Sequence, residues 1–237
     1  MPTAHPTLFD DGQYRTLCFP DGALQSRMDC TQPLVLHLEY TRLLMAFLHV
    51  VPAPGRIALI GLGGGSLLKY CHAHLPHSLL EVAEISPQVL AFAPHFGVPL
   101  PDARLRLHCV DGAAWIRGLR DCDVIVVDGY SSAGLDPALG SAAFFNDCRR
   151  ALAPGGVLLL NLLPGSKSFV AVLQRLRARF GDVRLTTDTE GCNCIATARA
   201  ATPAAALKQF HPPAHWSGAP ALAAALTRTW EQWHGWR

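Results

Sequence analysis

The fold is decided by residues 56–66, which read Arg56-Ile57-Ala58-Leu59-Ile60-Gly61-Leu62-Gly63-Gly64-Gly65-Ser66. An apolar run that ends in glycine is typical of a strand buried on both faces of a sheet. Glycine permits a tight turn and lets a ligand approach the backbone where a Cβ would exclude it. We therefore predict a buried strand over 56–60, a ligand-binding turn over 61–65, and a helix from Ser66 that ends before Pro76.

Outward from this stretch, short apolar runs alternate with helical segments, which is the pattern of a mostly parallel α/β sheet. Further strands are predicted at 79–85, 104–110, 122–127, 157–163, 183–187 and 192–198. Helices are predicted at 40–50, 142–152 and 166–180, and another begins at Pro87, a residue suited to the first helical position. The fold class is therefore α/β, with a Rossmann-like sheet.

The chain divides into three segments by composition. Residues 1–37 are rich in turn signals, such as Asp10-Asp11-Gly12 and Pro20-Asp21-Gly22, and are predicted to form a small β-hairpin appendage. Residues 38–200 form the Rossmann-like core. Residues 201–237 are rich in alanine, proline and tryptophan, and are predicted to be helical from about Ala221, with Pro220 at the first helical position. This tail either packs on the core or makes an oligomer contact.

Composition limits the class of protein. The 237 residues are 50% hydrophobic and 16% charged, with a net charge of +2, which argues against the concentrated basic face that nucleic acid requires. No apolar run reaches the roughly 18 residues that cross a bilayer, and residues 1–11 lack a signal-peptide pattern, so we expect a cytoplasmic protein without a membrane partner. The eight cysteines are scattered. Cys192 and Cys194, expected on one face of a strand, lack neighbouring ligands, so no metal site is predicted.

Acidic residues close three successive strands. Glu84 follows the last glycine of the turn by nineteen positions, and an acidic residue at about this distance hydrogen-bonds ribose hydroxyls. Asp111 and Asp128 end the next two strands. Because the carboxyl ends of parallel strands form the ligand crevice of an open α/β sheet, we expect these three carboxylates to line it. Ser66 takes the place of the last glycine of a dinucleotide fingerprint, which counts against a nicotinamide cofactor.

Taken together, these motifs resemble the spermidine synthase family. The resemblance rests, in order, on Asp21-Gly22-Ala23-Leu24-Gln25-Ser26, Tyr40, Leu59 to Ser66, Val82-Ala83-Glu84-Ile85-Ser86-Pro87, Val110-Asp111-Gly112-Ala113 and Asp123 to Asp128. It extends from about Leu17 to Ala198. It implies a sheet of the S-adenosylmethionine-dependent methyltransferase type, a small-molecule amine substrate and a homodimer.

The resemblance also implies roles for individual residues. The donor would be decarboxylated S-adenosylmethionine or S-adenosylmethionine itself, held by Gln25, Gly61, Gly63, Gly64, Gly65, Glu84, Ile85, Asp111 and Gly112. Glu84 would bind the ribose, and Asp111 would lie by the adenine amine. Tyr40 and Tyr130 would contact the acceptor, for example putrescine. Asp128 would orient and deprotonate the attacking nitrogen in an SN2 transfer of an aminopropyl group from sulfur.

The sequence departs from the family at three acidic positions, which here are Ser66, Ser86 and Ser131. The tyrosine-proline-serine-glycine stretch of the family also lacks a clear counterpart near 188–193. A polycation needs several carboxylates to offset its desolvation. Glu39, Asp136 and Glu190 are candidates to replace the missing ones, although each is more typical of solvated surface.

Two alternatives to aminopropyl transfer therefore stay open. The first is an S-adenosylmethionine-dependent methyltransferase that acts on a small molecule. Ser66 suits this reading, because an acidic residue there would repel the carboxylate that S-adenosylmethionine retains. The second is a catalytically silent relative that binds a nucleoside and acts through its tail.

Overall fold

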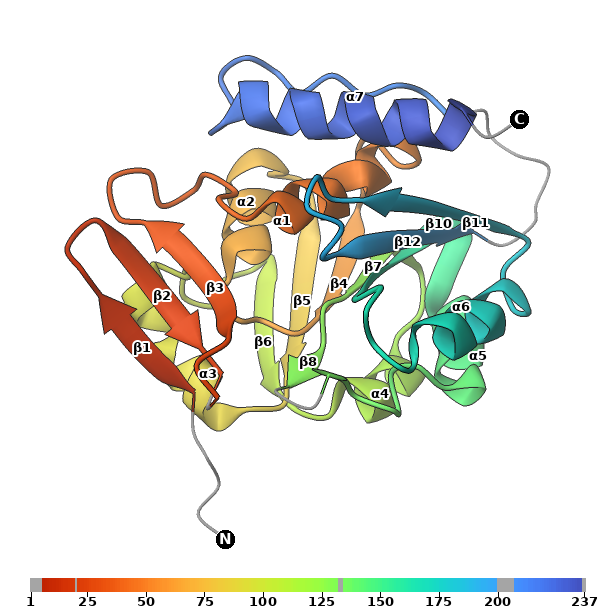
Figure 1. Ribbon diagram of the computed structural model, residues 1–237, viewed down its shortest axis with the longest axis horizontal. Coiled ribbons are helices and arrows are strands. Elements are labelled where there is room, and N and C mark those ends of the chain that lie inside the picture. Colours follow the sequence, from red (N-terminus) through yellow and green to blue (C-terminus); the bar gives the residue numbers. More distant parts are fainter. Residues whose placement is uncertain (1–5, 20, 132–133, 200–206, 236–237) are drawn as a thin grey trace, which may run out of the picture.

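A computed structural model describes residues 6–19, 21–131, 134–199 and 207–235, except for the side chain of Ser131. Its centre is a seven-stranded sheet in the order β11-β12-β10-β7-β4-β5-β6 (Figure 1). The strands are β4 (Arg56–Ile60), β5 (Leu79–Glu84), β6 (Leu105–Cys109), β7 (Cys122–Val127), β10 (Leu152–Leu162), β11 (Asp182–Thr187) and β12 (Cys194–Arg199). Neighbouring strands are parallel except for β12, which runs antiparallel to both β10 and β11. The predicted α/β fold class is confirmed.

Both faces of the central sheet are covered by helices. Ile57 and Leu59 face one apolar layer, while Ala58 and Ile60 face the other, because successive side chains of a strand point to opposite faces. The first layer contains buried residues of α1 (Glu39–Leu44), η1 (Met45–His49), α2 (Ser66–His74), α3 (Pro87–Phe92), η2 (Ala93–Phe96) and α7 (Ala219–Gly235). The second contains residues of α4 (Gly112–Trp115), η3 (Ile116–Gly118), α5 (Ala142–Ala151) and α6 (Phe169–Arg177). Burial on both faces explains why the strands read as continuous apolar runs.

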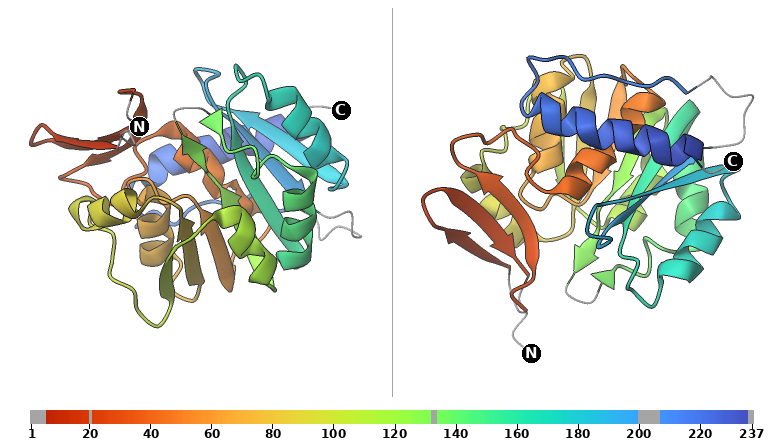
Figure 2. Two further views of the ribbon diagram at one scale, coloured as in Figure 1. Left: turned by 90° about the horizontal axis from the view of Figure 1, so that it is seen from below. Right: turned by 45° about the horizontal axis from the view of Figure 1, so that its top comes forward.

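The appendage contains one strand more than the predicted hairpin. β1 (Thr7–Asp10), β2 (Tyr14–Cys18) and β3 (Leu24–Asp29) form an antiparallel sheet that stands beside the central sheet (Figures 1 and 2). Each of the two turn signals found in the sequence reverses the chain, with Gly12 at φ 88° and Gly22 at φ 86°. Two reversals join three strands, so the single-hairpin expectation was wrong.

Several predicted boundaries also shift. The helix predicted at 40–50 is α1 followed by the 3-10 segment η1, and β10 begins at Leu152, with a register shift before Val157. A short hairpin of β8 (Tyr130–Ser131) and β9 (Gly134–Leu135) was not predicted. The expectation that Cys192 and Cys194 share a strand face is wrong: Cys192 is exposed and Cys194 is buried. The Asp188 carboxylate accepts the Cys192 N–H at 2.8 Å, which holds Cys192 in the turn before β12.

The C-terminal tail packs on the core, one of the two arrangements expected for it. Trp216 and Trp233 are only 8% and 7% exposed, and α7 lies across the first apolar layer (Figure 2). The buried His49 imidazole donates from Nε2 to the Leu226 carbonyl at 3.0 Å and accepts the Phe210 N–H at Nδ1 at 2.9 Å. Trp236 lies outside the described residues. No helix within the described ranges is long and apolar enough to span a membrane.

Candidate active site

A cavity of about 410 Å³ lies between the three-stranded sheet and the carboxyl ends of β4, β5, β7 and β10. Ten of the residues predicted for the site line it: Gln25, Tyr40, Gly61, Gly63, Glu84, Ile85, Asp111, Gly112, Asp128 and Tyr130. Gly64 and Gly65 do not. The structure therefore brings residues from six separate segments of the chain to the place where an open α/β sheet binds its ligand.

The glycines of the turn after β4 are required for different structural reasons. Gly61 has φ 96°, and a Cβ there would overlap the Asp128 backbone, whose N–H donates to the Ile60 carbonyl at 2.8 Å. Gly63 has φ 52°, and a Cβ there would meet nothing closer than Ser26 Cβ at 3.9 Å. Gly61 thus lets the ends of β4 and β7 come close together. Gly63, which has no side chain, leaves space in the cavity for a ligand to approach the backbone.

Gly64 and Gly65 hold the turn in place. A Cβ on Gly64 would lie 2.6 Å from Ser26 Oγ of β3, and one on Gly65, at φ 68°, would overlap Val98. Both glycines are therefore required by packing against neighbouring elements. Their predicted contact with the donor stays a prediction.

Glu84 is fixed at the cavity wall by the backbone around it. Its side chain is 6% exposed, and its two oxygens accept the Leu62 N–H and the Ser86 N–H, each at 2.8 Å. A carboxylate oxygen has a further lone pair, so both can still accept a hydroxyl. Ser86 caps α3 by accepting the Val89 N–H at 3.3 Å, which gives this departure from the family a structural role.

The lining residues on β3 and at the ends of β5 and β6 could hold a nucleoside. Asp111 caps α4, accepting the Ala113 N–H at 2.8 Å through one oxygen. Gln25 Oε1 is buried and has no hydrogen-bond partner among the described residues, so it fits an O–H or N–H donor on a ligand. Ile85 and Leu24 are 66% and 49% exposed at the cavity wall and offer apolar contact to a base.

Asp128, which follows β7, lines the cavity and is held by two side-chain hydrogen bonds. Its Oδ1 accepts the Asn161 Nδ2–H at 2.9 Å, and the Tyr40 hydroxyl also hydrogen-bonds to the carboxylate. Burial raises the pKa of Asp128 above its ordinary value, and the negative charge of Glu84 acts in the same direction. The two hydrogen bonds oppose this shift. Burial, followed by the charge of Asp128, raises the pKa of Tyr40 far above its usual range, so Tyr40 stays a hydrogen-bond donor.

Asn161 was missed by the sequence analysis. It lies on β10, is 3% exposed, and lines the cavity. Its backbone carbonyl accepts the Tyr130 hydroxyl at 2.9 Å, and burial raises the pKa of Tyr130. Its side-chain Oδ1 is buried with no partner in the described part of the chain. The available signal was one polar residue inside the apolar run of residues 157–163.

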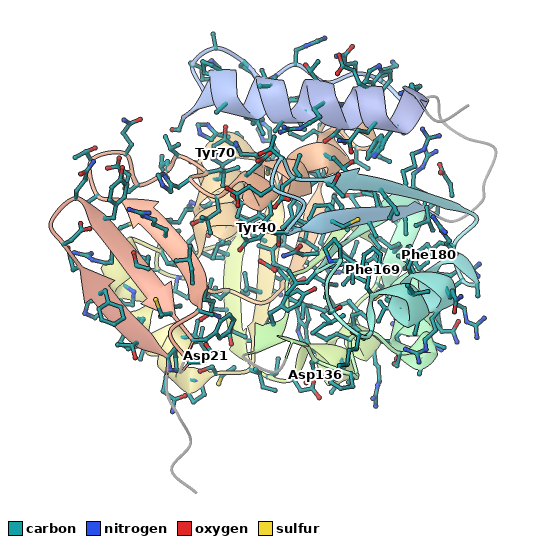
Figure 3. The ribbon with its side chains drawn as sticks, in the orientation of Figure 1. Asp21, Tyr40, Tyr70, Asp136, Phe169 and Phe180 are labelled. Atoms are coloured by element: carbon teal, nitrogen blue, oxygen red, sulfur yellow. The ribbon has the colours of Figure 1, made fainter. Side chains whose placement is uncertain are left out.

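The cavity wall is strongly acidic. Five carboxylates line it, from Asp21, Glu84, Asp111, Asp128 and Asp136, and its described lining residues include no lysine, arginine or histidine. Asp21, on the turn between β2 and β3, was not predicted, and Asp136 was one of three candidates. Figure 3 shows these two aspartates below Tyr40. Within the described ranges, no group of three or more histidine, cysteine, aspartate or glutamate side chains is arranged to hold a metal ion.

The other two candidate carboxylates lie elsewhere. Glu39 accepts the Thr189 N–H at 3.2 Å and forms an ion pair with Arg228 of α7, and it does not line the cavity. Glu190 is exposed in the turn between β11 and β12. Ser66 does line the cavity, at the start of α2.

The sheet order, the glycine turn after β4 and the acidic residue that ends β5 define a Rossmann-like domain of the S-adenosylmethionine-dependent methyltransferase type. The fold matches a probable spermidine synthase from Corynebacterium glutamicum with TM-score 0.73 at 21% identity, over 98% of this chain and 88% of that one. It also matches human methyltransferase-like protein 13 in complex with SAH, with TM-score 0.63 at 25% identity, over 84% of this chain and 96% of that one.

Sequence comparison identifies individual proteins that are similar to this chain. Polyamine aminopropyltransferase from Chromobacterium violaceum is 36% identical over 169 residues, which cover 70% of this chain and 65% of that protein. The one from Neisseria meningitidis is 34% identical over 174 residues, covering 72% and 66%. The chain is thus a homologue of the polyamine aminopropyltransferases, or spermidine synthases, and spans just under two thirds of the length of these curated relatives.

A methyltransferase is also similar to this chain in sequence. The eEF1A lysine and N-terminal methyltransferase of Xenopus laevis is 32% identical over 160 residues, which cover 57% of this chain and 23% of that protein. No family model matches the chain.

Proposed function

We propose that the protein transfers an aminopropyl group from decarboxylated S-adenosylmethionine to a small-molecule amine such as putrescine. The observation that carries this proposal is the acidic cavity, with five carboxylates and no basic side chain among its described lining residues. A sulfonium donor and an amine acceptor are both cations. Such ligands need negative charges at the site to offset their desolvation.

The same charge pattern favours the decarboxylated donor. S-adenosylmethionine carries a carboxylate next to its amine, and within a cavity of low dielectric constant a carboxylate near other carboxylates is repelled unless a cation pairs with it. The described cavity wall provides no such cation. We assign donor binding to the predicted donor residues that line the cavity, which are Gln25, Gly61, Gly63, Glu84, Ile85, Asp111 and Gly112.

Asp128 is assigned as the catalytic base, with Tyr40 and Tyr130 at the acceptor. The acceptor nitrogen attacks the carbon bonded to sulfur, so a carbon–nitrogen bond forms as the carbon–sulfur bond breaks and methylthioadenosine leaves. The nitrogen gives a proton to the Asp128 carboxylate. Burial raises the pKa of Asp128, which makes the carboxylate a better proton acceptor than an exposed aspartate.

Methyl transfer from S-adenosylmethionine is the second candidate. It is favoured by Ser66, which lines the cavity where the family has an acidic residue, and by the similarity to the eEF1A methyltransferase. In this reading the acceptor is again a small molecule. A silent nucleoside-binding relative, the third hypothesis from the sequence, has no observation in its favour beyond the missing family carboxylates.

Calorimetry with S-adenosylmethionine, its decarboxylated form and methylthioadenosine distinguishes these functions. We expect the decarboxylated donor to bind at least about tenfold more tightly than the parent, which corresponds to roughly 1.4 kcal/mol. Equal or tighter binding of S-adenosylmethionine would reject aminopropyl transfer and favour methyl transfer. Binding without turnover of any amine would indicate the silent relative.

The role of Asp128 is tested by Asp128→Asn. We expect turnover with putrescine to be abolished, because an amide does not accept the proton, while methylthioadenosine binding stays largely intact. An unchanged rate would remove Asp128 from the catalytic role.

We further propose that the protein is cytoplasmic and homodimeric. All eight cysteines are free, in keeping with a reducing compartment. For the dimer, Phe9, which is 58% exposed on the edge strand β1, offers an apolar contact. Light scattering of the purified protein tests the dimer, which a monomeric mass would refute.

A further inference from the structure

The start of α1 is a junction of three parts of the chain that lie far apart in the sequence. Glu39, the first residue of α1, accepts the Thr189 N–H at 3.2 Å through Oε2, which also accepts a hydrogen bond from the Thr189 hydroxyl. The other oxygen, Oε1, forms an ion pair with Arg228 of α7. Thr189 lies in the turn between β11 and β12. One carboxylate therefore joins α1, this turn and the C-terminal helix.

The ion pair in this junction is partly shielded from water. The side chains of Glu39 and Arg228 are 18% and 30% exposed, and α7 packs against α1 (Figure 2). Removing one partner of a partly buried pair leaves the other charge without compensation, which costs more than the loss of a fully exposed pair. The pair therefore constrains where α1 begins.

Both elements that Glu39 joins to α7 carry residues of the cavity wall. Tyr40 follows Glu39 in α1, lines the cavity and hydrogen-bonds to the Asp128 carboxylate. Asn193, at the end of the turn, also lines the cavity. The Asp188 N–H donates to the Asn193 carbonyl at 3.0 Å, and the Asn193 side chain donates to the Asp188 carboxylate at 2.9 Å, so the turn is closed on itself. A displacement of Glu39 would move both parts of the wall.

The junction acts on Asp128 through geometry. Glu39 and Arg228 do not line the cavity, so neither contacts a ligand bound there. The groups that act on the Asp128 carboxylate by hydrogen bond or charge come from α1, β10 and β5, and they are Tyr40, Asn161 and Glu84. Because a hydrogen bond weakens steeply as its length and angle depart from their optimum, the contribution of Tyr40 depends on where α1 begins.

We propose that Glu39 and Arg228 are positioning residues, which fix the start of α1 so that the Tyr40 hydroxyl meets the Asp128 carboxylate. The C-terminal helix is then part of the architecture of the active site, in addition to covering the first apolar layer. The consequence for catalysis rests on the proposed function, in which Asp128 is the base. The contact between Tyr40 and Asp128 does not depend on it.

The test that needs no turnover is a carbon-13 NMR titration of the Asp128 carboxyl group in the full chain, with Asp128→Asn to assign its signal. A hydrogen bond to the ionised form lowers the pKa, so we expect Tyr40→Phe to raise the pKa of Asp128 by about one unit. Arg228→Met removes the guanidinium but keeps an apolar side chain, and it should raise the pKa by at least about 0.3 unit. In the Tyr40→Phe background it should add less than about 0.1 unit, since no hydroxyl remains to be displaced.

Two variants test the two ends of the ion pair separately. Glu39→Gln keeps an oxygen for the Thr189 N–H but removes the charge, and it should raise the pKa of Asp128 as Arg228→Met does. Arg228→Lys keeps the charge and should recover part of the shift.

Arg184→Met is the matched control for a weakened C-terminal helix. Arg184 is 29% exposed and donates to the Trp233 carbonyl of α7 at 3.1 Å, so it ties α7 to β11 without contacting Glu39. It should leave the pKa of Asp128 in place.

Turnover gives the second readout. The acidic limb of the kcat/KM profile with putrescine should move to higher pH in Arg228→Met, as the NMR titration does, and stay in place in Arg184→Met. An unmoved pKa in Arg228→Met, an equal shift in Arg184→Met, or a shift that persists in full without the Tyr40 hydroxyl would overturn the positioning role. Failure of the unmodified protein to use any amine would instead reject the proposed function, and the NMR titration would still decide whether Arg228 positions Tyr40.

Discussion

Replacing Asn161 by leucine tests how the acidity of Asp128 is set. The substitution keeps the volume and the strand but removes the Nδ2–H that Asp128 Oδ1 accepts at 2.9 Å. The bond between the Tyr130 hydroxyl and the residue-161 backbone carbonyl does not depend on the side chain. Because the amide stabilises the ionised carboxylate, its loss leaves burial to act with less opposition and raises the pKa of Asp128 further.

The size of the shift follows from the energy of this hydrogen bond. A hydrogen bond to a charged group contributes about 1.5–3 kcal/mol, and one pKa unit corresponds to about 1.4 kcal/mol. We expect a rise of about one unit, at the lower end of this range, because Asp128 keeps the Tyr40 hydroxyl and faces a cavity open to water. The ionised carboxylate is the active form, so activity is present above this pKa and is lost as the pH falls through it.

The assay is the pH dependence of kcat/KM for a diamine, followed by methylthioadenosine release. The acidic limb should move to higher pH by about one unit in Asn161→Leu. Thr197→Val provides a matched control: Thr197 is 3% exposed on β12, its hydroxyl is buried without a partner in the described chain, and it does not line the cavity. Its profile should coincide with that of the unmodified protein. A lower rate in Asn161→Leu with an unmoved acidic limb would refute the reasoning.

Two further predictions concern Glu84 and the glycine turn. Glu84→Ala should weaken methylthioadenosine binding by about 1–3 kcal/mol in calorimetry, because it removes a charged acceptor, and an unchanged affinity would show that Glu84 does not hold the ribose. Gly65→Ala should lower the free energy of unfolding in urea by about 1–3 kcal/mol, since it adds a Cβ at φ 68° that overlaps Val98. Gly97→Ala, at φ 66° with nothing within 4 Å, measures the backbone cost alone, and equal losses in the two variants would exclude the overlap.

Local features of the chain were predictable because their cause is local. The run at 56–60 is apolar and ends in glycine, and it is a strand buried on both faces. Pro87 begins the predicted helix, because a proline suits the first helical position. The third strand of the appendage was missed because a turn signal marks a local chain reversal, whereas the number of strands depends on what pairs on both sides of each reversal.

The candidate site was predictable only in part. Residues at strand ends converge because the carboxyl ends of parallel strands share one edge, so Glu84, Asp111 and Asp128 could be grouped from their positions alone. The contact between Asp128 and Asn161 joins residues 33 positions apart, and it exists because β7 and β10 are neighbours in the sheet. Strand order is set by packing of the whole domain, which no single stretch of sequence encodes.

By itself, the sequence determined the α/β class, the glycine turn that suits a nucleoside, and the acidic strand ends, since periodicity, glycine and residue type act over a few neighbouring positions. The tertiary structure decided which further carboxylates face the cavity. Asp21 and Asp136 reach it through chain reversals, whereas Glu39 is held away by Thr189 and Arg228. It also decided that Gly64 and Gly65 serve packing, because the atoms they accommodate come from β3 and from Val98, distant in the chain.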